Sequence, residues 1–143
     1  LTVAENLEVG RQPPRKRAPT WTAERLFDLF PNRAELRHRP AGRVSGGEQQ
    51  MLTIARTLMG NPRAILLDEP SEGLAPVIVE QMAKTVLELK RQGVTMLFSE
   101  QNLRFARAVA DRALIMEKGR IRYTGTMAEL AADDEVRAAY LTV

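Results

Sequence analysis

The sequence predicts an α/β fold in which a helical segment precedes part of a parallel sheet. Before residue 61 the chain shows only helical periodicity and helix-capping patterns. Two short, continuous apolar runs follow at residues 64–67 and 94–98, and a long amphipathic pattern separates them. Such runs are typical of strands buried on both faces of a parallel sheet, because a helical crossover joins neighbouring parallel strands.

The first predicted helix begins after Thr2. Thr2 and Glu5 have the spacing of a capping box, which predicts a helix to about Val9, where Gly10 stops it. Residues 11–19 contain three prolines and predict a loop.

Three further helical segments complete the first half. Residues 21–30 carry an apolar face and end at Pro31, which cannot continue a helix. Residues 33–39 predict one or two more turns. The run 45–48 is a second capping box, and the helix that it begins ends at the Gly-Asn-Pro run 60–62.

The second half alternates between helix and strand. Besides the two apolar runs, it predicts a helix at 76–92, a helix at 103–110, strands at 113–117 and 120–123, and a helical region after 126. Pro76 suits a first helical turn and Gly93 a helix end. Lys118 and Gly119 form the predicted tight turn between the last two strands.

Composition excludes several classes of protein. No apolar run approaches the roughly 20 residues that cross a bilayer, and no signal-peptide pattern is present. The absence of cysteine removes disulfides and suits a reducing cytoplasm. A net charge of +3 is too small to argue for nucleic-acid binding. Basic residues gather at 11–17 and 33–43, which fits either solvated loops or contact with anionic lipid headgroups.

The run Ser45-Gly46-Gly47-Glu48-Gln49 is a candidate phosphate contact. It offers a hydroxyl and two glycine amides at a helix start, where peptide dipoles attract anions. The alternative is that Ser45 and Glu48 only cap the helix. The glycine pair favours the first interpretation, because two glycines in a first turn cost stability that a cap does not require.

Asp68 and Glu69 follow an apolar run, so a buried strand would deliver two adjacent carboxylates to its carboxyl end. Carboxylates in that position suit Mg²⁺ and water. The alternative is an acidic pair that caps the next segment, and Pro70 weakens it, because proline prevents an immediate helix.

Together these motifs resemble the ATP-binding subunits of ABC transporters, and the resemblance covers nearly all of the chain. Within that family, residues 1–7, 45–51, 68–76 and 100–102 look like the subunit of a branched-chain amino-acid importer, and residues 134–141 resemble its usual C-terminus. Urea or amide importer subunits are the runner-up. A soluble ABC ATPase without a transport role is a further alternative.

The resemblance implies a partial P-loop NTPase (ABC ATPase) fold. Its parts would be a helical signature subdomain at residues 1–60, an α/β catalytic-core portion at 61–117, and a C-terminal hairpin and helical tail at 118–143.

The resemblance also implies roles for single residues. The signature residues are expected to contact ATP held by a facing subunit: Ser45, Gly46, Gly47, Glu48 and Gln49. Asp68 is expected to hold Mg²⁺, usually through water, and Glu69 to polarise the attacking water as a catalytic residue.

Gln101 stands where most members carry a switch histidine, and Ala75 where most carry an aspartate. The amide of Gln101 can donate to a γ-phosphate oxygen but cannot titrate, which makes Gln101 the second catalytic candidate. A polar residue at a strand end, without catalytic role, is an equally good interpretation.

No run of the form G-x-x-x-x-G-K-[ST] occurs in these residues. The chain therefore resembles the C-terminal portion of a longer subunit. We expect the full-length subunit to be an ATPase coupled to transport. We expect the 143 residues alone to be inactive and to bind ATP poorly, because the lysine-bearing loop supplies most of the grip on the triphosphate.

Cofactors, partners and location are implied by the resemblance alone. They are ATP and Mg²⁺, a second ATP-binding subunit, integral membrane permease subunits and, indirectly, a solute-binding protein. The expected location is the cytoplasmic face of the cell membrane, as a peripheral subunit, with no nucleic-acid partner.

Overall fold

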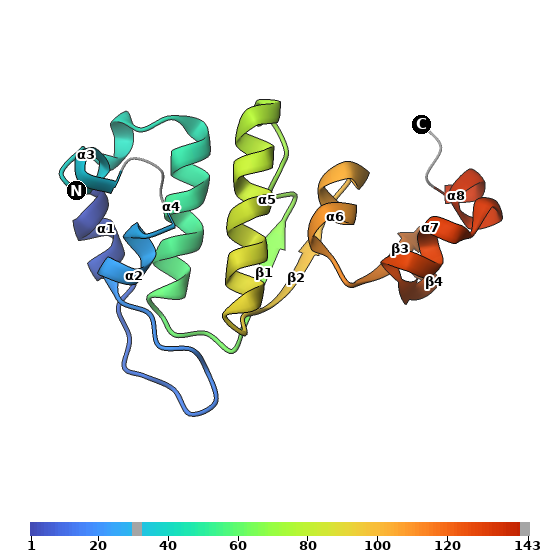
Figure 1. Cartoon of the computed structure of the whole chain (residues 1–143), viewed down its shortest axis with the longest axis horizontal. Coiled ribbons are helices and arrows are strands. Elements are labelled where there is room, and N and C mark those ends of the chain that lie inside the picture. Colours follow the sequence, from blue (N-terminus) through green and yellow to red (C-terminus); the bar gives the residue numbers. More distant parts are fainter. Residues whose placement is uncertain (30–32, 141–143) are drawn as a thin grey trace. The chain divides into compact units, whose positions relative to one another are not determined.

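The computed structural model describes residues 1–29 and 33–140 and divides the chain into two compact units (Figure 1). The first unit is Leu1–Asn102 and the second is Leu103–Val143. Both contain helices and strands, so the predicted α/β class is confirmed. The three predicted segments, with boundaries after residues 60 and 117, remain a prediction.

The helical part of the first unit contains five elements: α1 (Val3–Val9), α2 (Ala23–Phe27), α3 (Arg33–Arg37), the 3₁₀ helix η1 (Ala41–Arg43) and α4 (Gly46–Leu58). Capping boxes start α1 at Thr2 and α4 at Ser45, as predicted. The helix predicted at 21–30 is shorter at both ends, because Thr22 is its N-cap and Asp28 its C-cap. Phe30 and Pro31, on which its predicted end depended, lie outside the described residues.

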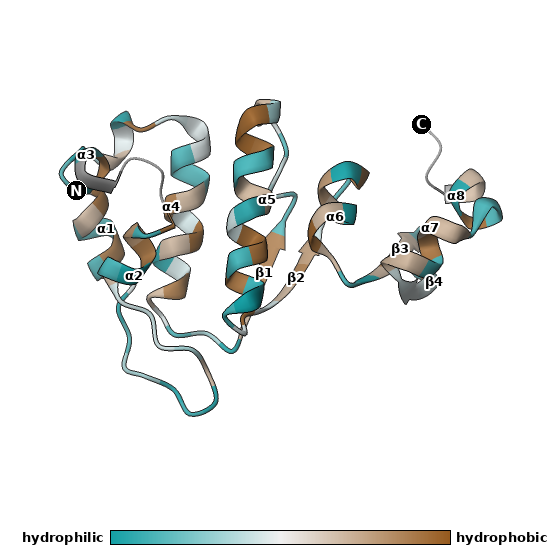
Figure 2. Cartoon of the chain, viewed as in Figure 1, coloured by the Kyte–Doolittle hydropathy of each residue, from teal (hydrophilic) through white to brown (hydrophobic). Residues whose placement is uncertain are grey.

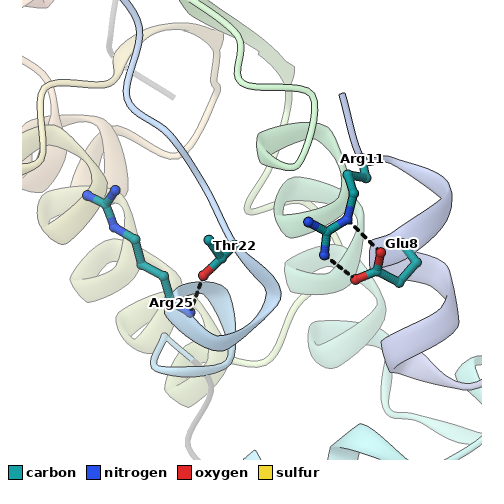
Figure 3. A network of polar contacts seen from close by, with 4 residues as sticks. All are labelled: Glu8, Arg11, Thr22 and Arg25. Atoms are coloured by element: carbon teal, nitrogen blue, oxygen red, sulfur yellow. Dashed lines mark hydrogen bonds and ion pairs between the residues drawn. The ribbon is translucent and has the colours of Figure 1, made fainter. Parts of the chain in front are cut away.

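These helices pack around one apolar core, whose buried members include Val3, Leu7, Trp21, Leu26, Phe27, Leu36, Ile54, Leu58 and Met59. Two local polar contacts, each between residues three positions apart, lie at the surface of this part (Figure 3). The Arg11 guanidinium pairs with the Glu8 carboxylate at 2.6 Å, and the Thr22 hydroxyl accepts the Arg25 backbone N–H at 3.3 Å.

Asn61 clamps both ends of the proline-rich loop between α1 and α2. It is only 2% exposed and has a left-handed backbone, with φ of 48°. Its Oδ1 accepts the Trp21 backbone N–H at 2.7 Å, and its Nδ2 donates to the Gln12 carbonyl at 2.8 Å. One side chain therefore joins the two ends of the loop to the segment that follows α4.

The first unit also contains a two-stranded parallel sheet. Strand β1 (Ala64–Asp68) pairs with β2 (Thr95–Ser99), and the helix α5 (Pro76–Arg91) connects them. The register places Ala64 opposite Thr95 and Asp68 opposite Ser99. Both strands and the parallel pairing were predicted.

The prediction that both strands are buried on both faces is wrong. Ile65 is 2% exposed, but its neighbour Leu66 is 76% exposed, and Leu97 on β2 is 60% exposed. Figure 2 shows the apolar character of both strands. The crossover helix can cover only one face of a two-stranded sheet, so the other face stays open in the described part of this unit. We call this the open face, formed by alternate residues of both strands: Ala64, Leu66, Asp68, Thr95, Leu97 and Ser99.

The second unit begins with α6 (Leu103–Val109) and continues with an antiparallel hairpin of β3 (Arg112–Glu117) and β4 (Arg120–Thr126). The hairpin turns at Lys118 and Gly119, both with positive φ, as a two-residue turn requires. Helices α7 (Met127–Ala132) and α8 (Asp134–Tyr140) follow. Within the described residues, no helix combines the length and apolarity needed to cross a bilayer.

Replacing Asn61 by alanine should lower the free energy of unfolding by about 2–3 kcal/mol. The buried backbone N–H of Trp21 loses its acceptor, and the Gln12 carbonyl loses its donor. Asn61→Asp should cost less, since it keeps the acceptor. Urea denaturation measures both changes. An unfolding free energy of Asn61→Ala equal to that of the unaltered chain would show that the clamp contributes nothing.

Candidate functional site

The carboxyl ends of β1 and β2 bring two polar side chains together. Asp68 ends β1 and Ser99 ends β2, and parallel strands present these ends at the same edge. The Ser99 hydroxyl donates to Asp68 Oδ1. The Glu69 backbone N–H donates to the Ser99 carbonyl at 3.1 Å and to the Ser99 hydroxyl at 3.3 Å. The predicted pair of acids is therefore anchored to the neighbouring strand.

Glu69 turns the chain out of the strand and meets Gln101. Its φ of 43° lies in the left-handed region, and the buried Pro70 follows. Gln101 Nε2 donates to Glu69 Oε1 at 2.5 Å. The structure thus brings together the two residues predicted to be catalytic, and the amide of Gln101 has the Glu69 carboxylate as its partner.

Two more carboxylates complete the group. The Glu72 carboxyl hydrogen-bonds the Glu69 carboxyl, and this contact, together with the charge of Glu69, raises the pKa of Glu72. Glu100 accepts the Ser71 N–H at 3.3 Å and the Asn102 N–H at 2.9 Å. Sequence reasoning did not assign these glutamates to the site. These glutamates come close to Glu69 because the chain turns at Glu69, and no local sequence pattern indicates that turn.

The predicted signature lies at the start of α4 and is well formed as a cap. Ser45 Oγ accepts the Glu48 N–H at 3.3 Å, and Glu48 Oε2 accepts the Ser45 N–H at 2.7 Å. Gln49 Nε2 donates to the Val44 carbonyl at 3.3 Å. Ser45, Gly46 and Gln49 are exposed. Among the described residues, no hydrogen bond joins this cap to the group around Asp68.

The two glycines of the signature differ in their surroundings. A Cβ on Gly47 would lie 2.3 Å from Ile78 Cγ2 on α5, whereas a Cβ on Gly46 would meet nothing within 4 Å. The argument that a cap has no need of two glycines is therefore wrong for Gly47, because close packing of α4 on α5 requires its missing side chain. Gly46 alone leaves open space at the helix start.

The donor set at the sheet edge fits a hard cation that also binds phosphate. Mg²⁺ prefers oxygen ligands and commonly uses one or two carboxylates together with substrate phosphates. Ser99 holds Asp68 Oδ1, and no hydrogen bond to Oδ2 is found among the described residues. Within the part of the chain that the structure describes, no group of three or more acidic, histidine or cysteine side chains could hold a metal alone. A carboxylate such as Asp68 fits a Mg²⁺ ion that is also bound by nucleotide phosphates.

A hollow of about 250 Å³ lies against this edge, lined by Leu66, Leu67, Asp68, Leu97 and Ser99. It opens on the uncovered side of the sheet, so Asp68 faces space. A larger hollow of about 400 Å³ is lined entirely by the second unit and includes none of the predicted site residues. The smaller hollow is therefore the better candidate for the functional site, because the Asp68 carboxylate lines it.

Comparison with known proteins points to one family. The sequence model of the family described as ABC transporter matches residues 1–72, which is half of the chain. This stretch includes the signature and the Asp68-Glu69 pair.

Several relatives match nearly the whole chain. The chain is 45% identical, over 99% of its length, to the high-affinity branched-chain amino acid transport ATP-binding protein BraG of Pseudomonas aeruginosa. It is 34% identical, again over 99%, to the lipopolysaccharide export ATP-binding protein LptB of Haemophilus influenzae. It spans only 60% and 59% of these relatives.

A solved structure supports the same fold. The ADP conformation of MJ1267, an ATP-binding cassette of an ABC transporter, superimposes with a TM-score of 0.75 at 30% identity. The match covers 100% of this chain and 63% of that one. The predicted partial P-loop NTPase fold is confirmed.

Gly47→Ala should destabilise the chain by about 1–3 kcal/mol, because the new methyl group must displace the β-branched side chain of Ile78. Gly46→Ala is the matched control: it should leave stability equal or slightly higher, since alanine favours helix and has room. Urea denaturation compares the two. Equal effects of the two changes would contradict the packing argument.

Glu72→Gln should raise the Tm at pH 7, and the gain should disappear as the pH falls below about 4.5. A raised pKa in the folded chain means that ionisation of Glu72 opposes folding, so the cost is absent at low pH and grows as the pH rises. Thermal melts from pH 3.5 to 8 measure the change. Glu80→Gln, which removes the same charge from an exposed position on α5, is the control and should show no such dependence.

Proposed function

The chain belongs to the ABC transporter family, and from this premise we propose that it forms the signature and carboxylate portion of an ATP-hydrolysing subunit that powers import of branched-chain amino acids. The single observation that carries the proposal is the group at the carboxyl edge of the sheet, in which Ser99 bonds Asp68 and the Glu69 backbone, and Gln101 bonds the Glu69 carboxylate. In open α/β sheets, ligands bind outside this edge.

Glu69 is the proposed base that orients the attacking water. Its Oε1 accepts a hydrogen bond from Gln101, which fixes the carboxylate that would receive a proton from the water. Gln101 holds the carboxylate in place and, with its amide beside the reacting phosphate, can donate to a γ-phosphate oxygen. Catalysis then rests on positioning and on electrostatic stabilisation of an in-line attack.

Asp68 is the proposed ligand of Mg²⁺. The ion, when bound with nucleotide, would neutralise charge on the phosphates. Among the described residues, Asp68 would offer one carboxylate oxygen to the ion. The Ser99 hydroxyl holds the other carboxylate oxygen of Asp68.

The signature is proposed to act on nucleotide held by a second ATP-binding subunit. Ser45 and Gly46 are exposed at the start of a 13-residue helix, so the hydroxyl and the free amides of the first turn can face a phosphate. Glu48 and Gln49 support this surface by bonding back to Ser45 and Val44. Gly47 serves the packing of the same turn.

The proposed solute and partners rest on the relatives. The 45% identity to a branched-chain amino acid transport protein favours these solutes over lipopolysaccharide, since the lipopolysaccharide export relative is 34% identical. Integral membrane permease subunits, a second ATP-binding subunit and, indirectly, a solute-binding protein complete the proposed assembly. The subunit would lie peripherally at the cytoplasmic face of the membrane.

Glu69→Gln should reduce ATP turnover at least about 100-fold, because general-base assistance contributes a factor of about 10²–10⁴. The test uses the assembled subunit and measures phosphate release. ATP should still bind, trapping a closed pair of subunits on gel filtration. Glu80→Gln is the control and should keep full turnover.

Unchanged turnover in Glu69→Gln would reject the assignment. The solute is tested in the reconstituted transporter: leucine, isoleucine or valine with the solute-binding protein should stimulate hydrolysis. Stimulation by urea or amides instead would reject the branched-chain assignment and leave the ATPase assignment intact.

A further inference from the structure

Ser99 contacts both acids of the site, through its hydroxyl and its backbone carbonyl. The register places it directly opposite Asp68, with both side chains on the open face of the sheet. Its hydroxyl donates its only proton to Asp68 Oδ1 and accepts the Glu69 backbone N–H at 3.3 Å. One hydroxyl therefore links the side chain of one acid to the backbone of the next.

This arrangement restricts the Asp68 carboxylate. A hydroxyl-to-carboxylate hydrogen bond is among the stronger neutral-to-charged contacts, and it fixes one oxygen. The second oxygen, Oδ2, is left for another ligand, and the 250 Å³ hollow that Asp68 and Ser99 line provides space there. The hydroxyl proton is fully used by Asp68, so Ser99 itself is not a free donor to a ligand.

We propose that Ser99 is a positioning residue that sets the orientation of the Asp68 carboxylate for a nucleotide-bound Mg²⁺. The inference rests on the proposed function, because it concerns the same site. Partners that hydrogen-bond a metal-ligating carboxylate orient it, and their loss typically costs about 10- to 100-fold in metal affinity. Ser99 acts through Asp68 and does not touch the ion.

The chain supplies a matched comparison on the same strand. Thr95 carries a hydroxyl on the open face of β2, but its register partner is Ala64, which has no carboxylate. Thr95→Ala therefore removes a hydroxyl, together with one methyl group, at the far end of the strand. Ser99→Thr keeps a hydroxyl and a residue that favours strands.

The first measurement needs no metal and no activity. NMR couplings report the χ1 rotamer of Asp68 in the 143-residue chain. We expect one rotamer in the unaltered chain, averaging over rotamers in Ser99→Ala, and a single rotamer again in Ser99→Thr. Thr95→Ala should match the unaltered chain. A single, unchanged rotamer in Ser99→Ala would overturn the proposal.

The second measurement is binding of Mn²⁺, as a spectroscopic substitute for Mg²⁺, to the assembled subunit with ATP. Electron paramagnetic resonance gives the affinity. Ser99→Ala should weaken it about tenfold, Ser99→Thr should restore it, and Thr95→Ala should leave it unchanged. An unchanged affinity in Ser99→Ala, with normal binding in the unaltered subunit, overturns the role of Ser99 alone. No Mn²⁺–ATP binding in the unaltered subunit overturns the proposed function and this inference with it.

Discussion

The site depends on the register in which β1 and β2 pair. Asp68 lies opposite Ser99, and this one pairing fixes the Asp68 carboxylate, the Glu69 backbone and the point where the chain leaves the sheet. Side chains alternate between the faces of a sheet, so a slip of one residue would turn Asp68 and Ser99 to opposite faces. Gln101 reaches Glu69 only because β2 ends level with β1.

The group at the sheet edge carries more negative charge than its surroundings balance. Asp68, Glu69, Glu72 and Glu100 make no ion pair among the described residues. Glu72 contacts the Glu69 carboxyl, and the partners of the other three acids include a hydroxyl, an amide and backbone N–H groups. Neutral donors orient carboxylates without cancelling their charge. The raised pKa of Glu72 is the local sign of this surplus, and a bound cation would relieve it.

Local patterns predicted the elements well and their surroundings less well. Capping boxes at Thr2, Ser45 and Thr126 start α1, α4 and α7, because the cap is a contact within four residues. The turn at Lys118 and Gly119 is equally local. The open face was missed, because a continuous apolar run does not reveal how many neighbours cover the strand.

Within the site, sequence reasoning found Asp68 and Glu69 as an acidic pair after a strand and Gln101 through the family resemblance, and the structure brings Glu69 and Gln101 together. It missed Ser99 and Glu72, whose contacts depend on strand register and on the left-handed backbone at Glu69. The packing role of Gly47 was also out of reach, since Ile78 lies 31 positions further along the chain.

The contact between Gly47 and Ile78 has a mechanical consequence. Backbone and side chain touch there with no compressible layer between the first turns of α4 and α5. The start of α5 follows the acidic edge by only a few residues. A movement of α5 toward α4 would therefore meet the first turn of α4 at Gly47, without a side chain of Gly47 to yield.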